Sequence, residues 1–306
     1  MASVIPVLAR TKLGLQAVRA AAPAPVVLVP TMGALHDGHR ILLRRAREIS
    51  QPNGTLLVSV FVNPLQFGPG EDYDSYPRNL QQDLAVCAQE GAAAVFAPER
   101  SQLYPGPQLI TVHPGPMGQV LEGQSRPGFF EGVLTVVLKL FQLVKPDVAV
   151  FGQKDAQQLA LVARMTADLN LGVQIASAPI VRDGDGLAAS SRNAYLSARD
   201  RATALALPRA LQAGSAAAAA GPGAVRAAAR SVLAAAAAAD PPLLVDYLAL
   251  TDPATFEEVT AGFTGQALLL AAVRVGSTRL IDNVPLTLGG QSGPGHLDQP
   301  GPGHLE

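Results

Sequence analysis

The chain has 306 residues, of which 48% are hydrophobic and 15% are charged, and its formal net charge is −1. At roughly 100 to 200 residues per domain, this length predicts two domains with a sizeable core. The near-zero net charge excludes a global field that would attract nucleic acid or an anionic membrane. The single cysteine, Cys87, excludes an internal disulfide framework.

The sequence shows no signal-peptide pattern at its start and no uninterrupted apolar run of about 18 residues. We therefore expect a soluble, cytoplasmic protein. Cys87 falls on a predicted helix, where a buried thiol is more common than a reactive one.

Strands alternate with helices over the first 180 residues. After a helix over 11–22, the apolar pattern predicts strands over 24–29, 54–62, 93–97, 147–151 and 173–176, with intervening helices over 40–49, 79–90, 130–144 and 156–170. This alternation favours a Rossmann-like, mainly parallel sheet covered on both faces. The segment 98–126 is long for a loop, and such loops are usually functional or hold extra structure.

The composition and the order of the predicted elements change near residue 180. The alanine-rich segment 204–239, split by Gly221-Pro222-Gly223, predicts two helices joined by a turn, and apolar strands follow over 243–248, 267–275 and 279–283. We therefore expect an α/β domain over 1–180 and a smaller α+β domain over 181–288. The Gly/Pro-rich tail 289–306 is predicted to be disordered.

The turn from Pro30 to His39 joins the first predicted strand to the next helix. Gly33 and Gly38 let the backbone approach a ligand closely, and the helix N-terminus offers free N–H groups to an anion. His36 and His39 are three residues apart, so we expect both imidazoles to point toward the same place, an arrangement that suits a triphosphate.

Two other interpretations of this histidine pair remain open. The histidines can be surface polar residues, or they can be ligands of a zinc site. Zinc is the weaker alternative, because no glutamate separates the histidines as in His-Glu-x-x-His and no Cys/His cluster supplies further ligands.

Polar residues also follow two other predicted strands. Asn63 and Gln66 come after the second strand, and Lys154 and Asp155 come after the fourth. Because ligands bind beyond the carboxyl ends of parallel strands, we expect these residues and the histidines to converge.

Seven segments, taken in order, give the chain a clear resemblance to a known family. They are TMGALHDGH (31–39), FVNPLQF (61–67), YPR (76–78), SRPG (125–128), FGQKDAQQLAL (151–161), DGLAASSRNAYL (185–196) and RLIDN (279–283). From about residue 3 to 288 the chain resembles the pantothenate synthetases, or pantoate–β-alanine ligases. The His-x-Gly-His element alone indicates only the wider nucleotidyltransferase superfamily shared with class I aminoacyl-tRNA synthetases.

The resemblance implies an ATP-dependent ligase that condenses (R)-pantoate with β-alanine through a pantoyl-adenylate and releases AMP and pyrophosphate. It implies ATP as substrate, Mg²⁺ as its companion ion and a homodimer, with no nucleic-acid or membrane partner. An HxGH nucleotidyltransferase acting on another small acceptor and a non-catalytic nucleotide sensor remain as alternatives.

The resemblance also assigns site residues, including cationic or hydroxyl donors to the phosphates. It gives catalytic roles to His36, His39 and Lys154, with His39 as the proton donor, and places Gln66 and Gln158 at the pantoate and β-alanine sites. Asp83 matches an acid near the magnesium ion. The implied ATP contacts are Met32, Gly33, Ala34, Leu35, His36, Asp37, Gly38, His39, Gly152, Gln153, Lys154, Asp155, Val181, Ala189, Ser190, Ser191 and Arg192.

Several positions depart from the family pattern. Gln82 stands where the family often has another acid, and Phe129 replaces a common histidine, although Arg126 is retained. Gln153 and Ala156 replace a glutamate and an aromatic residue, and Ala189 replaces a methionine, a change that can enlarge the adenine pocket. We expect the segment 190–192 to form a lid over the triphosphate; without the other motifs, it would read equally well as a solvated loop with a helix cap.

Overall fold

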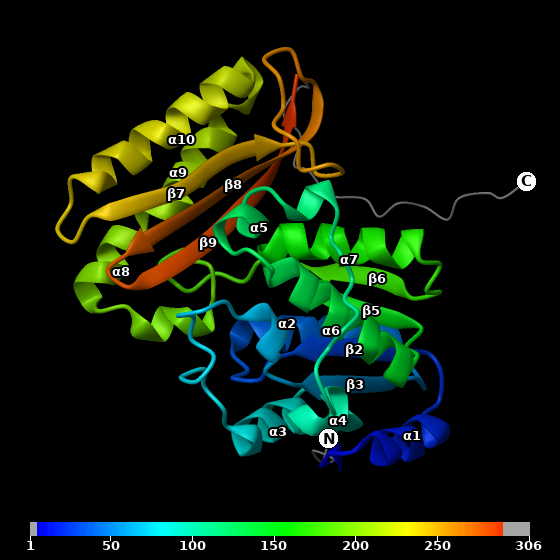
Figure 1. The fold of residues 1–306 in the computed structure, drawn as a ribbon. Helices are drawn as coiled ribbons and strands as arrows, with labels where there is room; N and C mark the ends of the chain where they lie inside the picture. The colour runs from blue at the N-terminus through cyan, green and yellow to red at the C-terminus, as the bar shows by residue number, and fades with distance from the viewer. Residues whose placement is uncertain (1–4, 290–306) are drawn as a thin grey trace, which may run out of the picture. The chain divides into compact units, whose positions relative to one another are not determined.

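The structure, a computed structural model, describes residues 5–289. Its contacts divide the chain into two compact units, with the division between Arg201 and Ala202 (Figure 1). This division lies after the expected boundary at residue 180, and the ion pair of Arg192 with Asp72 connects residues 181–201 to the first unit. Of the predicted tail, all but Gly289 lies outside the described residues.

A six-stranded parallel sheet in the order β1-β4-β3-β2-β5-β6 forms the centre of the first unit (Figure 1). Its strands are β1 (Val7–Ala9), β2 (Val26–Thr31), β3 (Thr55–Val60), β4 (Ala94–Phe96), β5 (Val148–Gly152) and β6 (Gln174–Ala178). The parallel sheet confirms the predicted fold class. The sequence analysis did not predict β1, because three residues are too few to show a periodicity.

Helices cover both faces of this sheet. They are α1 (Lys12–Ala21), α2 (Asp37–Ser50), α3 (Leu80–Gln89), α4 (Arg100–Leu103), α5 (Glu122–Ser125), α6 (Phe129–Val144) and α7 (Ala156–Asp168), and α8 (Ala198–Ala204) spans the division between the units. Alternate residues of β2 enter opposite cores: Leu28 packs with residues of α1, α6 and α7, and Val27 packs with residues of α2 and α3. The long segment 98–126 holds extra structure, as one of the two expectations for it proposed.

Cys87 lies in the core beside α2 and is fully buried. Burial raises the pKa of its thiol to about 12, so the thiolate is not populated at neutral pH. The prediction of a buried thiol is confirmed.

The second unit is a three-stranded antiparallel sheet packed against two helices. Its elements are α9 (Ala206–Ala216), α10 (Pro222–Ala237), β7 (Leu243–Thr251), β8 (Gly265–Val275) and β9 (Thr278–Leu288). The alanine-rich segment thus forms two helices, as predicted. Gly214 lets α9 lie close to the sheet, because an added Cβ would be 2.5 Å from Leu269 Cδ2.

None of the helices within residues 5–289 has the length and apolar character needed to cross a lipid bilayer.

Candidate active site

Two histidines cap the start of α2. His36 Nδ1 accepts a hydrogen bond from the Gly38 N–H at 3.1 Å, and His39 Nδ1 accepts one from the His36 N–H at 3.2 Å. The ring centroids are 4.2 Å apart, so the two imidazoles do lie together. Because both Nδ1 atoms accept, each neutral ring carries its proton on Nε2, where it is available to a ligand.

The surroundings of the pair favour uncharged imidazoles. Desolvation and the charge of Lys154 lower the pKa of His36. Desolvation, His36 and Lys154 together lower the pKa of His39 to about 3. At neutral pH the histidines therefore serve as N–H donors, and the positive charge at this point comes from Lys154 rather than from the rings.

The residues after β5 face the same point. Lys154 lies in a 3-10 turn, Gln153–Asp155, that follows β5, and its Nζ is 3.8 Å from the Asp155 carboxylate. Since β5 is a neighbour of β2, the electrostatic effect of Lys154 on both histidines matches the expected convergence of these two turns. Gln153 Nε2 donates to Ser177 Oγ on β6 at 3.2 Å.

The turn after β3 lies beside the turn after β2, on the side opposite to β5. Gln66 Nε2 donates to Met32 Sδ at 2.9 Å, which links the turns after β3 and β2. The buried Asn63 fixes the Gln66 amide, because its Nδ2 donates to Gln66 Oε1 at 3.1 Å and to the Gly132 carbonyl at 3.0 Å. Asn63 Oδ1 in turn accepts the Tyr104 hydroxyl at 2.8 Å.

Two adjacent glutamines at the start of α7 have different roles. Gln157 is buried, and its Nε2 donates to the carbonyls of Met117 and Val120 at 2.8 and 2.9 Å, so it holds the loop before α5. Gln158 is partly exposed, and its side chain makes no hydrogen bond within the described residues. Its amide is therefore available to a ligand.

A guanidinium that the sequence analysis did not place in the site supports Gln66. Arg126 Nε and Nη2 donate to the two Glu71 oxygens at 2.7 and 2.8 Å, and Nη2 also donates to the Gln66 carbonyl at 3.2 Å. The guanidinium carbon lies 3.7 Å from the centroid of the Phe129 ring. Although burial opposes ionisation, the Arg126 hydrogen bonds hold the pKa of Glu71 below its usual value. The retained arginine of the RPG turn was the signal for this network.

The serine-rich segment packs within the first unit. The Ala189 N–H donates to the Val181 carbonyl at 2.8 Å, and an added Cβ on Gly38 would lie 3.9 Å from Ala189 Cβ, which places Ala189 beside the start of α2. Ser190 Oγ accepts the Arg192 N–H at 3.3 Å.

Two residues of the loop after β3, Asp72 and Tyr76, are hydrogen-bonded to this segment. Arg192 donates to Asp72 Oδ1 at 3.1 Å, and Ser191 is hydrogen-bonded to the buried Tyr76. Neither Asp72 nor Tyr76 was among the predicted site residues, although Tyr76 belongs to the YPR motif (76–78) of the resemblance.

Asp83 lies beneath the turn that precedes α2. Asp83 is only 2% exposed. Its two carboxylate oxygens accept hydrogen bonds from the N–H groups of Ala34 at 3.2 Å and Leu35 at 2.8 Å. Asp37, by contrast, is exposed. Among residues 5–289, no group of three or more His, Cys, Asp or Glu side chains is placed to hold a metal ion.

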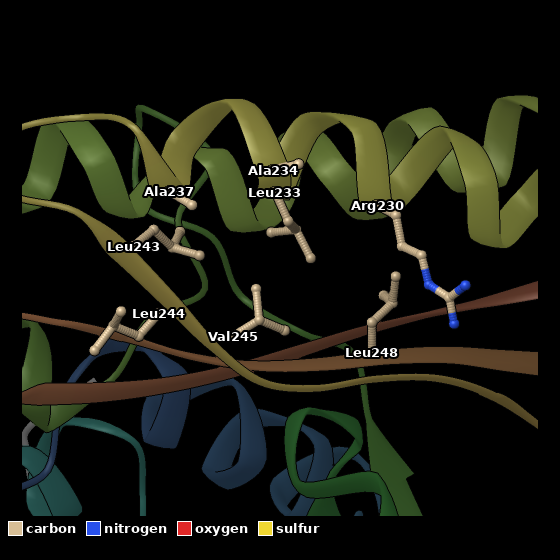
Figure 2. A pocket seen from close by; sticks show the side chains of 8 residues that line it. All are labelled: Arg230, Leu233, Ala234, Ala237, Leu243, Leu244, Val245 and Leu248. Carbon is tan, nitrogen blue, oxygen red and sulfur yellow. The ribbon is translucent and has the colours of Figure 1, made fainter.

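The second unit has an apolar pocket of its own. It encloses about 530 Å³ between α10 and β7 (Figure 2). Its lining consists of Arg230, Leu233, Ala234, Ala237, Leu243, Leu244, Val245 and Leu248. None of the predicted site residues borders it, and it offers no paired donors for a phosphate.

Known proteins resemble the chain over most of its length. A family model described as pantoate-beta-alanine ligase matches residues 6–285. A pantothenate synthetase of Thermobifida fusca is 61% identical over 289 residues, which cover 92% of this chain and 96% of that protein.

Solved structures also resemble the chain over most of its length. The crystal structure of pantothenate synthetase from Thermus thermophilus has a TM-score of 0.84 at 43% identity and covers 91% of this chain and 98% of that one. A pantoate-beta-alanine ligase from Francisella tularensis, complexed with beta-gamma ATP and beta-alanine, has a TM-score of 0.73 at 31% identity and covers 91% and 97%. With its parallel sheet, its histidine-capped turn and these relatives, the chain belongs to the pantoate–β-alanine ligase family.

Proposed function

We propose that this protein condenses (R)-pantoate with β-alanine at the expense of ATP, through a pantoyl-adenylate. The observation that carries the proposal is the meeting of two Nε2–H donors, His36 and His39, with the charge of Lys154 at the carboxyl edge of the sheet. The Francisella ligase, which was solved in complex with beta-gamma ATP and beta-alanine, supports the same assignment.

In the first step a pantoate carboxylate oxygen attacks the α-phosphorus of ATP. A new P–O bond forms, the bond to the β-phosphate oxygen breaks, and pyrophosphate leaves. The barrier lies in bringing anions together and in stabilising the departing pyrophosphate. His36, His39 and Lys154 supply N–H donors and one positive charge, and Ser190, Ser191 and Arg192 supply further donors from the segment beside α2.

In the second step the β-alanine amine attacks the acyl carbon. The C–N bond forms, the C–O bond to the adenylate breaks, AMP leaves, and the amine loses its proton to solvent. Gln66 and Gln158 are neutral amides that can orient the hydroxyl and carboxylate groups of pantoate without competing for protons. Because AMP is a good leaving group, correct positioning of the amine suffices for this step.

Magnesium accompanies ATP in this proposal. Mg²⁺ keeps several waters and binds mainly to phosphate oxygens, so it needs few protein ligands. The remaining ATP contacts implied by the resemblance, a cytoplasmic location and a homodimer also belong to the proposal, as does a lid role for residues 190–192. In the described fold, the contacts of these residues with Asp72 and Tyr76 would have to rearrange as such a lid opens.

The direct test is pyrophosphate release from ATP, with pantoate alone and then with β-alanine. We expect pantoate-dependent release that β-alanine amplifies, with AMP and pantothenate as products. His39→Ala should reduce the rate at least tenfold, whereas His113→Ala, at an exposed histidine, should not.

The same assay separates the alternatives. A ligase for another acceptor would release pyrophosphate only with that acceptor. A nucleotide sensor would bind ATP and release none. Either result, from folded protein that binds ATP, would contradict the proposal.

A further inference from the structure

The turn between β2 and α2 has an unusual backbone. Gly33 and Ala34 both have positive φ angles, +82° and +51°. The left-handed conformation is ordinary for glycine, but for alanine it costs on the order of 1 kcal/mol and persists only where surrounding contacts impose it. These two residues place the Leu35 and His36 backbone for the histidine cap that follows.

Asp83, on α3, makes the contacts that impose this conformation. Its Oδ2 accepts the Ala34 N–H at 3.2 Å and its Oδ1 accepts the Leu35 N–H at 2.8 Å. Each oxygen therefore compensates one buried or partly buried amide that neither the helix nor the sheet satisfies.

The carboxylate is also closely packed. An added Cβ on Gly33 would lie 2.7 Å from Asp83 Oδ2, and the residue as a whole is 2% exposed. A magnesium ion prefers octahedral oxygen ligands at about 2.0–2.1 Å and retains several waters. There is no room for such an ion and its waters between this carboxylate and the turn.

The neighbouring residue does not supply an alternative ligand. Gln82 is exposed and carries an amide, whose Oε1 accepts from Asn79 Nδ2 at 3.3 Å. The donor set at the start of α3 thus does not fit a magnesium site built on Asp83.

We propose that Asp83 is a positioning residue, which holds the turn 33–35 in its ATP-binding conformation from below, and that it does not ligate magnesium. The proposal deepens the function proposed above and rests on it for the identity of the ligand. The contact between Asp83 and the turn, however, can be measured without any ligand.

The first measurement is amide hydrogen exchange at Ala34 and Leu35 in the full-length protein without nucleotide or metal. We expect Asp83→Asn to accelerate exchange at Ala34 or Leu35 at least tenfold, because one of the two N–H groups would face the Asn NH₂ group instead of an acceptor. Added MgCl₂ should leave the wild-type exchange rates unchanged. Asp168→Asn, which changes an exposed carboxylate at the end of α7, is the matched control.

The second measurement is steady-state kinetics with ATP and Mg²⁺ varied separately. We expect Asp83→Asn to raise KM for ATP roughly ten- to a hundredfold, while the half-saturating free Mg²⁺ at saturating ATP stays within about twofold of wild type. If Asp83→Asn fails to fold, Gly33→Ala disturbs the same contact with the carboxylate retained and should give the same two results.

The opposite pattern would overturn the proposal. Unchanged exchange at Ala34 and Leu35, together with a large rise in half-saturating Mg²⁺ and an unchanged KM for ATP, would make Asp83 a metal ligand. If the protein proved to have no ligase activity, the exchange measurement would still decide whether Asp83 holds the turn. The failure of one proposal is thus distinguishable from the failure of the other.

Discussion

At the level of single residues, the histidine pair carries a pH dependence whose direction follows from its burial. In the unfolded chain His39 takes up a proton near its ordinary pKa of 6.5, whereas in the folded protein it does so only near 3. Between these values protonation favours the unfolded chain, so the free energy of unfolding falls as the pH is lowered from about 6.5 toward 3.

The variant His39→Asn keeps an acceptor for the His36 N–H but has no imidazole to titrate. Between pH 7 and pH 5, we expect the free energy of unfolding of this variant to fall by about 2 kcal/mol less than that of wild type. Urea unfolding at both pH values measures the difference, and His113→Asn, at an exposed histidine, is the control. An identical pH dependence in wild type and His39→Asn would show that His39 is protonated in the folded protein.

Arg126 and Phe129 provide a second residue-level prediction. The ring that replaces the family's usual histidine lies 3.7 Å from the Arg126 guanidinium carbon, so it packs against the group that holds Glu71 and the Gln66 carbonyl. We expect Phe129→Leu and Arg126→Lys each to raise KM for pantoate several-fold. The coupling in a double-mutant cycle should be about 1 kcal/mol. Strictly additive effects would mean that the ring does not support the guanidinium.

At the level of elements, α6 approaches the turn after β3 closely. An added Cβ on Gly132 would lie 2.1 Å from the Leu65 carbonyl oxygen, so only glycine allows α6 to pack there. The same approach lets Asn63 reach the Gly132 carbonyl and thereby orient Gln66.

We therefore expect Gly132→Ala to push this turn outward and raise KM for pantoate at least tenfold, with a much smaller effect on KM for ATP. The control is Gly106→Ala, because an added Cβ at Gly106 meets open space. Steady-state kinetics with each substrate varied in turn makes the comparison. Equal losses for ATP and pantoate would indicate general damage to the fold instead.

The elements show what the sequence could and could not predict. Helices and buried strands were predictable because their apolar periods are long, and the convergence of three turns followed from the rule for parallel strands. β1 is too short to show a period. Asn63 and Arg126 together hold Gln66 in place. This depends on contacts between residues far apart in the chain, such as Arg126 with Glu71, and no local sequence pattern encodes them.

The role of Asp83 was hidden for a similar reason. The resemblance placed this acid near magnesium, and only the fold shows that both its oxygens meet backbone N–H groups of a turn almost fifty residues earlier. The neutral state of the histidines likewise comes from burial and from Lys154, both of which depend on the tertiary structure.

At the level of the whole molecule, the position of residues 182–201 matters most. The sequence suggested a boundary at residue 180, but the ion pair of Arg192 with Asp72 connects this segment to the first unit. Light scattering on the full chain tests a further expectation at this scale, the homodimer implied by the family. We expect a mass of twice 31.6 kDa, and a mass of 31.6 kDa at micromolar concentration would contradict it.

The central claim is that this site joins the pantoate carboxylate to the α-phosphorus of ATP. The most direct measurement is to supply pantoate labelled with ¹⁸O in its carboxylate, together with ATP and β-alanine, and to locate the label by mass spectrometry. We predict one ¹⁸O atom in AMP, because the oxygen that attacks phosphorus leaves with AMP when the amine displaces it. Unlabelled AMP, or formation of ADP with ¹⁸O in inorganic phosphate, would contradict the claim.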